Sequence, residues 1–150
     1  MHTTSSRMIV IDASVALWAV LPAVSRFDTL APITRWRARG VRLTAPGLWL
    51  AACASTIRGL VHNGLISLKE GRRVLDDVLL LEVEPRPMTP VQTRAAFTWS
   101  TRLGQRRAYD GFYLALAEEL QAEFWSADRR LVGSARQIGV TWVHAVDESP

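Results

Sequence analysis

The hydrophobic and polar positions of the chain follow two periods, which together predict strands that alternate with helices. Short apolar runs rich in β-branched residues predict buried strands, and stretches in which apolar residues recur every three or four positions predict helices. The expected strands cover residues 8–11, 41–45, 80–83, 123–126 and 140–143. The expected helices cover residues 15–20, 23–39, 46–63, 67–79, 90–103, 109–120 and 129–138.

Residues typical of helix starts support several of these boundaries. Ser67 and Glu70 form a capping box at the start of the fourth expected helix, and Thr89-Pro90 suits the start of the fifth. Strands that alternate with helices in this order indicate an α/β fold with right-handed crossovers. We therefore expect a three-layer sandwich with a mainly parallel central sheet flanked by helices. Residues 1–150 form a single domain in this interpretation, because no repeat or linker interrupts the pattern.

The composition is that of a folded domain with a core. Of the 150 residues, 49% are hydrophobic and 21% are charged, which excludes a disordered chain. The formal charge is +4, and nearly all of the basic residues are arginine, since Lys69 is the only lysine. Arginine pairs well with phosphate and carboxylate groups, so the charge is compatible with an anionic partner. An excess of this size does not by itself indicate a nucleic acid.

Cysteine usage and hydropathy predict a soluble, cytoplasmic protein. Cys53 is the only cysteine, which excludes an internal disulfide and a cysteine-based zinc cluster and fits a reducing compartment. Residues 1–7 are polar and Asp12 interrupts the apolar run after them, so no signal peptide is expected. No apolar stretch approaches the roughly 18 residues of a membrane helix, so no membrane partner is expected.

Three aspartates lie at the ends of expected elements. Asp12 follows the first strand, Asp110 lies at the start of an apolar helix, and Asp128 follows the fourth strand. Because the carboxyl ends of parallel strands meet at one edge of a sheet, these acids are expected to converge there. Carboxylates held close together repel, and a divalent cation stabilises such a cluster. Oxygen ligands suit Mg²⁺ or Mn²⁺, the ions used in phosphodiester hydrolysis, so the three acids are candidate metal ligands and catalytic residues.

Each aspartate also has a structural interpretation, as the cap of a neighbouring helix. The chemical role is best supported for Asp110, because placing an acid in an otherwise apolar helix costs free energy and is not expected without a function. Ser14 and Ser126 likewise have a functional and a structural interpretation. Their hydroxyls either support the acids by hydrogen bonding or serve as a helix cap and a strand-end group.

The sequence resembles the PIN-domain ribonucleases, and within them the VapC-type toxins of VapBC toxin–antitoxin pairs. Three short motifs carry the resemblance: V-I-D-A-S at 10–14, Y-D-G-F-Y-L-A-L-A at 109–117 and S-A-D-R-R-L at 126–131. The apolar helix that follows Pro46 also fits. Each motif alone is short, but their order and spacing cover nearly the whole chain.

The resemblance implies a function, a cofactor and partners. Members of the family bind metal through acids at the positions of Asp12, Asp110 and Asp128. The implied cofactor is Mg²⁺ or Mn²⁺ and the implied substrate is RNA, cleaved to leave a 5′-phosphate and a 3′-hydroxyl. The implied protein partners are a second copy of the chain, in a homodimer, and a cognate antitoxin whose C-terminal segment plugs the site. Four arginines near the acids could contact RNA phosphates or lie on a solvated face: Arg106, Arg107, Arg129 and Arg130.

One position departs from the family pattern. Similar proteins carry a glutamate in a W-x-x-E setting in the helix after the proline, whereas this chain has Ala52 in Trp49-Leu50-Ala51-Ala52. No acid occurs between Asp28 and Glu70, so no neighbour in this helix can substitute. Losing a ligand or its support commonly costs ten- to a hundred-fold in metal affinity or activity. Ala52 is either a natural degeneration or a change that permits expression of a toxic protein.

Three functional hypotheses follow. The first is a metal-dependent endoribonuclease of the toxin type, impaired by Ala52. The second is a catalytically degenerate PIN-fold module that binds RNA or an antitoxin. The third, a response-regulator-like domain that binds Mg²⁺ for phosphotransfer, is disfavoured because no lysine follows a late strand. Large apolar residues on expected surface helices further suggest association into a homodimer: Trp18, Trp36, Trp49 and Trp99.

Overall fold

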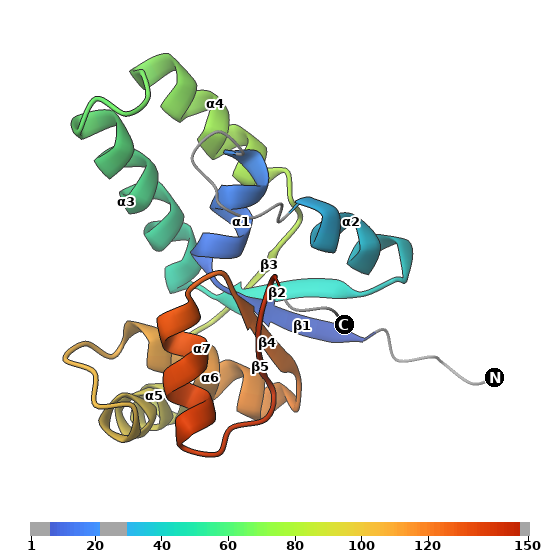
Figure 1. Ribbon diagram of the computed structural model, residues 1–150, viewed down its shortest axis with the longest axis vertical. Coiled ribbons are helices and arrows are strands. Elements are labelled where there is room, and N and C mark those ends of the chain that lie inside the picture. Colours follow the sequence, from blue (N-terminus) through green and yellow to red (C-terminus); the bar gives the residue numbers. More distant parts are fainter. Residues whose placement is uncertain (1–6, 22–29, 148–150) are drawn as a thin grey trace.

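The computed structural model describes residues 7–21 and 30–147, in which five strands form one parallel sheet (Figure 1). The sheet has the order β3-β2-β1-β4-β5, and every neighbouring pair is parallel. The strands are β1 Met8–Ile11, β2 Arg42–Pro46, β3 Glu84–Arg86, β4 Glu123–Ser126 and β5 Val143–Ala145. This arrangement confirms the predicted α/β class with a parallel central sheet.

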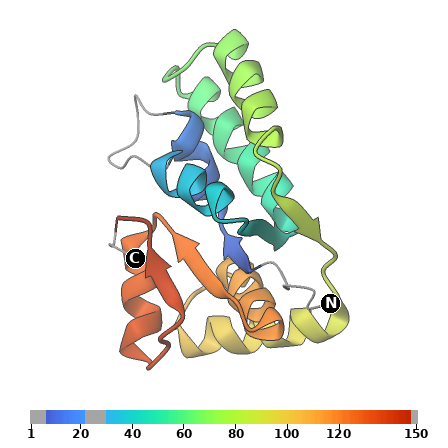
Figure 2. The ribbon, with the colours of Figure 1, turned by 90° about the vertical axis from the view of Figure 1, so that its right-hand side faces the viewer.

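Helices cover both faces of the sheet, as Figures 1 and 2 show. One layer contains α1 Ala13–Val20, α2 Leu30–Ala38, α3 Leu48–His62 and α4 Leu68–Leu79. The other contains α5 Pro90–Arg102, α6 Tyr109–Leu120 and α7 Arg129–Gln137. From the centre of the sheet, β1, β2 and β3 follow one another toward one edge, and β4 and β5 follow one another toward the other edge. Since crossovers are right-handed, the reversal places the two sets of helices on opposite faces.

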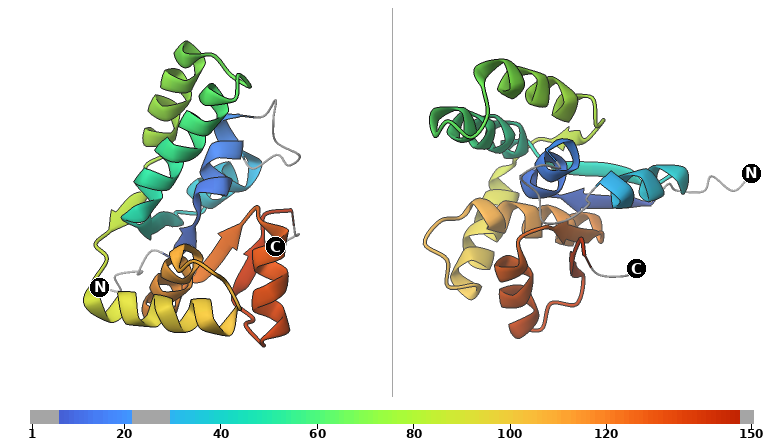
Figure 3. Two further views of the ribbon diagram at one scale, coloured as in Figure 1. Left: turned by 90° about the vertical axis from the view of Figure 1, so that its left-hand side faces the viewer. Right: turned by 45° about the horizontal axis from the view of Figure 1, so that its top comes forward.

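The reversal of strand order lies between β1 and β4, at the centre of the sheet. In open α/β sheets the chain diverges at such a point, and ligands bind in the crevice outside the carboxyl ends of the two strands. Asp12 directly follows β1, and Ser126 ends β4. The topology therefore brings the first and third sequence motifs to one place. Helices α3 and α4 pack against each other as an antiparallel pair that extends away from the sheet (Figure 3).

The core explains the run of apolar residues in β1. Ile9, Val10 and Ile11 are fully buried, because β1 is the central strand and helices cover both of its faces. Tryptophans also contribute to this core: Trp49, Trp99 and Trp36 have 1%, 4% and 9% of their surface exposed. Trp18 packs partly buried against the same cluster. Burial of these side chains removes the argument that drew a dimer interface from exposed tryptophans.

The third strand lies later in the chain than the sequence pattern predicts. Residues 80–83 were expected to be a strand, but Leu80 and Leu81 form a turn after α4, and β3 begins at Glu84. Leu80 is 74% exposed, so this apolar residue is not part of the sheet. Pro85 lies within β3, which is tolerated because β3 is an edge strand and need not donate a hydrogen bond on its outer side.

The last strand is also displaced, and it shares only Val143 with the expected range 140–143. Gly139 adopts a φ of +87° after α7, a conformation that favours glycine and reverses the chain. The N–H of Val140 then bonds the carbonyl oxygen of Ala135 in α7 at 3.1 Å. Val140 therefore belongs to the end of α7. Of the expected strand 140–143, the first residue closes the helix and only the last lies in β5.

The helix boundaries agree better with the sequence. Ser67 caps α4 and accepts a hydrogen bond from the N–H of Glu70, and Thr89 caps α5 in the same way. Of the helix expected over 23–39, the structure gives α2 at Leu30–Ala38, and residues 22–29 lie outside the described ranges. No helix within residues 7–21 and 30–147 combines the length and apolar character needed to cross a bilayer.

Candidate active site

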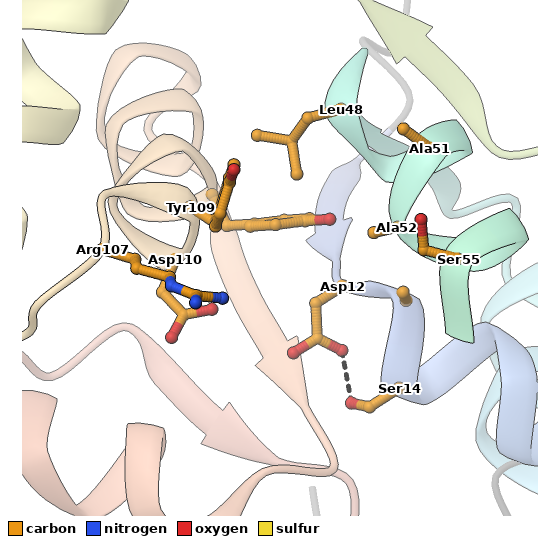
Figure 4. A pocket seen from close by; sticks show the side chains of 11 residues that line it. Asp12, Ser14, Leu48, Ala51, Ala52, Ser55, Arg107, Tyr109 and Asp110 are labelled. Carbon is orange, nitrogen blue, oxygen red and sulfur yellow. Dashed lines mark hydrogen bonds between the residues drawn. The ribbon is translucent and has the colours of Figure 1, made fainter. Parts of the chain in front are cut away.

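A pocket of about 490 Å³ opens where the end of β1 meets the first turns of α3 and α6 (Figure 4). Its position is the crevice expected from the reversal of strand order. Elements distant in the sequence supply its lining: Asp12, Ala13, Ser14, Leu48, Ala51, Ala52, Ser55, Arg107, Tyr109, Asp110 and Tyr113. Two of the three predicted acids, Asp12 and Asp110, thus face one cavity.

Asp12 is held by hydrogen bonds on both carboxylate oxygens. Its Oδ1 accepts hydrogen bonds from the Ser14 hydroxyl and, at 3.3 Å, from the N–H of Val15, and its Oδ2 accepts one from the Ser126 hydroxyl. Only 8% of the residue is exposed. The bond from Val15 makes Asp12 the N-cap of α1. Asp12 therefore caps the helix, as its structural interpretation predicted, and it also lines the pocket.

The two serines link the ends of β1 and β4. Ser14 Oγ accepts the N–H of Ala127 at 3.0 Å, and Ser126 Oγ accepts the N–H of Asp128 at 2.9 Å. Each hydroxyl can therefore donate its single proton to Asp12 while its lone pairs bind the backbone. This confirms the predicted contact of Ser14 and Ser126 with an acid, and it fixes the orientation of the Asp12 carboxylate.

The environment of Asp12 disfavours its negative charge. Burial raises the pKa of Asp12 to about 6, the hydrogen bonds from Ser126, Ser14 and Val15 oppose that rise, and the charge of Asp110 adds to it. A carboxylate that accepts three hydrogen bonds yet keeps a raised pKa lacks a nearby positive charge sufficient to balance it. A cation in the pocket would supply that balance.

Asp110 lies in the first turn of α6 and does not cap it, since the N-cap is Ala108. Burial raises the pKa of Asp110, a hydrogen bond from Gln105 lowers it, and the charge of Asp128 raises it again. The Gln105 Nε2 donates to Oδ2 of Asp110 at 2.8 Å. The charge of Asp110 thus acts on Asp12, and the charge of Asp128 acts on Asp110.

Asp128 is exposed and caps α7, where its Oδ1 accepts the N–H groups of Arg130 at 3.0 Å and Leu131 at 3.3 Å. The capping interpretation is therefore correct, and Asp128 is not among the residues that line the pocket. Within residues 7–21 and 30–147, no three His, Cys, Asp or Glu side chains are grouped closely enough to hold one ion together. The expected three-acid cluster is thus realised as a pair in the pocket with Asp128 beside it.

Helix α3 forms the wall opposite Asp110, and its side chains there are small. Ala51, Ala52 and Ser55 lie on the side of α3 that faces the pocket, next to Leu48 (Figure 4). Ala52 therefore occupies a position from which a longer acidic side chain would project toward Asp12. This placement agrees with the sequence comparison that identified Ala52 as the position of the missing acid.

Arg107 and two tyrosines complete the lining. Arg107 lines the same pocket as Asp110, and Tyr109, which also lines it, is 62% exposed (Figure 4). Tyr113 is buried, and burial together with the charges of Asp12, Cys53 and Asp110 holds the pKa of its phenol well above the usual range. Sequence reasoning missed Tyr113, although it follows Asp110 by three residues and so shares its helix face.

The other residues named from sequence have mainly structural surroundings. Arg129 forms an ion pair with Asp147, whereas Arg106 and Arg130 are exposed outside the pocket lining. The Cys53 thiol is buried, which raises its pKa to about 12 and leaves it a core residue, as expected.

The oxygen donors of the pocket fit a small, hard cation. Mg²⁺ commonly binds through one or two carboxylates and keeps several waters, so the pair of Asp12 and Asp110 is sufficient as a protein contribution. Burial raises the pKa of both acids, and the charge of Asp110 raises that of Asp12 further. A divalent ion beside them would favour their ionised forms. The lining contains no histidine or cysteine that would favour a softer metal.

Comparison with known proteins gives consistent results, although no protein-family model matches the chain. VapC ribonuclease Mb0985 of Mycobacterium bovis is 34% identical over 124 residues, which span 83% of this chain and 88% of that protein. Ribonuclease VapC12 of Mycobacterium tuberculosis is 35% identical over 127 residues, or 85% of this chain and 92% of that protein.

Solved structures share the fold at low sequence identity. PAE2754 from Pyrobaculum aerophilum superimposes with a TM-score of 0.67 and 15% identity, covering 95% of this chain and 85% of that one. The structure of VapBC2 from Rickettsia felis, bound to a DNA fragment from the VapBC2 promoter, gives a TM-score of 0.64 and 12% identity. That match covers 92% of this chain and 98% of the solved one.

Proposed function

Because this chain belongs to the VapC family of PIN-domain ribonucleases, we propose that it is a metal-dependent endoribonuclease that hydrolyses phosphodiester bonds of RNA. The observation that carries the proposal is the pairing of Asp12 and Asp110 in one pocket at the reversal of strand order. Both acids come from the sequence motifs, and the fold brings them together from distant parts of the chain.

Asp12 and Asp110 would hold a Mg²⁺ or Mn²⁺ ion, with Asp128 as a supporting acid beside Asp110. The ion supplies Lewis acidity, which activates water for attack and neutralises charge that develops on the phosphate. Ser14 and Ser126 keep both Asp12 oxygens in place, so that the carboxylate need not reorganise when a cation arrives. The preorganised pair is what the protein contributes to the metal site.

Arg107 would bind the substrate. Its guanidinium lines the same pocket as the acids, and arginine forms bidentate bonds with phosphate. A phosphate bound by Arg107 would lie in the same pocket as the two acids, which would restrict the position of the scissile bond. The exposed Tyr109 and the small side chains of α3 leave the pocket open for a polynucleotide strand.

We further propose an antitoxin protein as the partner of this chain. Support comes from the structural likeness to VapBC2 and from membership of the VapC family. A homodimer of this chain is a separate proposal, which does not depend on the antitoxin.

A second candidate function is a degenerate module that binds RNA or the antitoxin without cleavage. The observation in its favour is the methyl group of Ala52 in the pocket wall, where the resemblance places a glutamate. Rate measurements separate the two functions. RNA that binds the pocket and remains intact with Mn²⁺ present would support the degenerate module.

The proposal predicts that Mn²⁺ stabilises the folded protein. Binding to the folded state alone raises the free energy of unfolding by about 2.7 kcal/mol at a hundred-fold excess over the Kd, so the melting temperature should rise by several degrees. The rise should disappear in Asp12→Asn and Asp110→Asn. It should persist in Asp77→Asn, a matched control on α4 whose carboxylate forms an ion pair with Arg73 at the surface.

Cleavage of a fluorescent RNA provides the second measurement. We expect slow, Mn²⁺-dependent cleavage by the unmodified chain and by Asp77→Asn, and none by the two pocket variants. A melting temperature that does not respond to Mn²⁺, together with cleavage that survives Asp12→Asn, would refute the metal-dependent mechanism.

A further inference from the structure

The segment between α5 and α6 holds an amide group against one of the two pocket acids. Gly104 adopts a φ of +66° and turns the chain after α5. The N–H of Gln105 then bonds the carbonyl oxygen of Ser100 at 2.9 Å, which fixes the residue to the last turn of α5. From there the Gln105 side chain reaches forward, and its Nε2 donates to Oδ2 of Asp110 at 2.8 Å.

The orientation of this amide is determined by the carboxylate. An ionised carboxylate only accepts hydrogen bonds, so the NH₂ end of Gln105 must face Asp110 and the carbonyl end must face away. The carbonyl Oε1 is consequently buried without a hydrogen-bond partner. A buried acceptor left in this state is costly, and it is therefore rare in folded proteins.

The free-energy cost of the unpaired carbonyl indicates the role of Gln105. A residue selected only for packing at this half-buried position could be apolar and would leave no unpaired atom. The amide gains stabilisation only through its charge-assisted bond to Asp110, which requires Asp110 to be ionised. The bond also occupies Oδ2 and so sets which oxygen of Asp110 is left for the pocket.

We propose that Gln105 is a positioning residue for the metal site, which holds Asp110 in the orientation that presents Oδ1 to a divalent cation. The inference rests on the proposed function, because it assigns Asp110 as a ligand. It goes beyond that function in naming a neutral residue, outside the motifs that carry the family resemblance, on which the ion site depends. Orientation by hydrogen-bonded neighbours typically accounts for ten- to a hundred-fold in metal affinity.

The chain offers a matched control on the same pair of helices. Gln92 lies on α5 and its Nε2 donates to a carboxylate oxygen of Glu119 on α6, far along the helices from the pocket. Gln92→Met and Gln105→Met therefore each remove a hydrogen bond from a glutamine amide to a carboxylate of α6. The side chains keep a similar length in both cases, and only one of the two bonds touches the candidate site.

The experiment measures Mn²⁺ affinity by the loss of the electron paramagnetic resonance signal of the free ion, without RNA. We expect the Kd to rise at least about ten-fold in Gln105→Met and to change less than about two-fold in Gln92→Met. An unchanged Kd in Gln105→Met, or an equal loss in both variants, would overturn the inference. Absence of Mn²⁺ binding by the unmodified chain would instead overturn the proposed function.

A second measurement does not depend on whether the variant folds. The side-chain amide of Gln105 in the unmodified protein gives its own nuclear magnetic resonance signals. Those signals should shift on addition of Mg²⁺ and broaden with substoichiometric Mn²⁺, whereas those of Gln92 should respond little. If Gln105 responds no more than Gln92 although the ion binds, Gln105 does not act on the ion site.

Discussion

Asp12 combines a structural and a chemical task in one buried side chain. It caps α1, accepts hydroxyl hydrogen bonds from Ser14 and Ser126, and lines the candidate active site. Helix caps are usually exposed, and a cap could be kept by asparagine at little cost. The proposed cation would account for a buried carboxylate at this position, which the capping of α1 alone does not require.

The raised pKa of Asp12 predicts how stability depends on pH. The carboxyl group is half protonated near pH 3.8 in the unfolded chain and at about 6 in the folded protein. The folded state therefore holds the proton longer, and its stability falls as the pH rises from about 4 through 6. The difference corresponds to roughly 3 kcal/mol when the acid is fully ionised.

We accordingly expect Asp12→Asn to stabilise the metal-free protein at pH 7.5 by roughly 1 to 3 kcal/mol and to have little effect at pH 4. Urea unfolding in the presence of a chelator provides the measurement. Ser14→Ala and Ser126→Ala should have the opposite effect at pH 7.5, because each removes a hydrogen bond to the ionised acid. A gain from Asp12→Asn that is the same at both pH values would show that burial of the charge is not its cause.

Ala52 leads to a prediction at the same scale. The residue lines the pocket on the side of α3 that faces the acids, so Ala52→Glu adds a carboxylate where a cation would bind. We expect Mn²⁺ affinity and RNA cleavage to increase at least about ten-fold. Ala54→Glu serves as the control, because Ala54 is exposed on α3 and does not line the pocket. Equal effects of the two substitutions would indicate a general influence of charge.

At the scale of elements, the close packing of α5 against α6 places Asp110. A Cβ at Gly111 would lie 2.2 Å from the carbonyl oxygen of Ala96 and 2.7 Å from Oγ of Ser100. Glycine is thus required for the two helices to approach so closely, and the residue next to it is the pocket acid. The same approach brings the end of α5, and with it Gln105, within reach of Asp110.

Gly111→Ala should therefore destabilise the fold and weaken the site together. Overpacking of this kind typically costs about 1 to 3 kcal/mol, and separation of the helices would move Asp110 away from Asp12. Thermal unfolding and Mn²⁺ affinity would both be measured. Gly133→Ala on α7 is the control, because nothing lies within 4 Å of a Cβ there and alanine should stabilise the helix by up to about 1 kcal/mol. A Gly111→Ala protein as stable as the unmodified chain would contradict the packing argument.

At the scale of the whole molecule, the surface still carries large apolar side chains. Three of the tryptophans first considered for an interface belong to the core, but Val91 and Phe97 on α5 are 72% and 71% exposed. Exposed apolar groups of this size on one helix are typical of an interaction surface. The expected homodimer would therefore use α5 rather than the tryptophan positions.

Sedimentation equilibrium tests this expectation. We expect a dimer at micromolar concentration and a shift toward monomer in Phe97→Ser. Leu80→Ser is the control, because Leu80 is similarly exposed, at 74%, but lies in the turn between α4 and β3. A monomer at every concentration, without an antitoxin present, would count against homodimer formation.

The sequence by itself determined most of the local structure, and it named the residues that are proposed to carry the chemistry. Periodicity predicted the helices and three of the five strands, and the caps Ser67 and Thr89 were correctly identified from residue type. The motifs named Asp12 and Asp110, and the departure from the family pattern named Ala52. These features depend on neighbours in the chain, which is why a single sequence reveals them.

Tertiary structure alone decided how these residues meet. The strand order places Asp12 and Ser126 together, and the contact between α5 and α6 determines where Asp110 and Gln105 lie. Long-range pairing also displaced β3 and β5, because a β-strand needs a partner and apolar runs such as 80–83 can serve a turn instead. Asp128 shows the same limit, since its motif does not reveal that it caps α7 and lies outside the pocket lining.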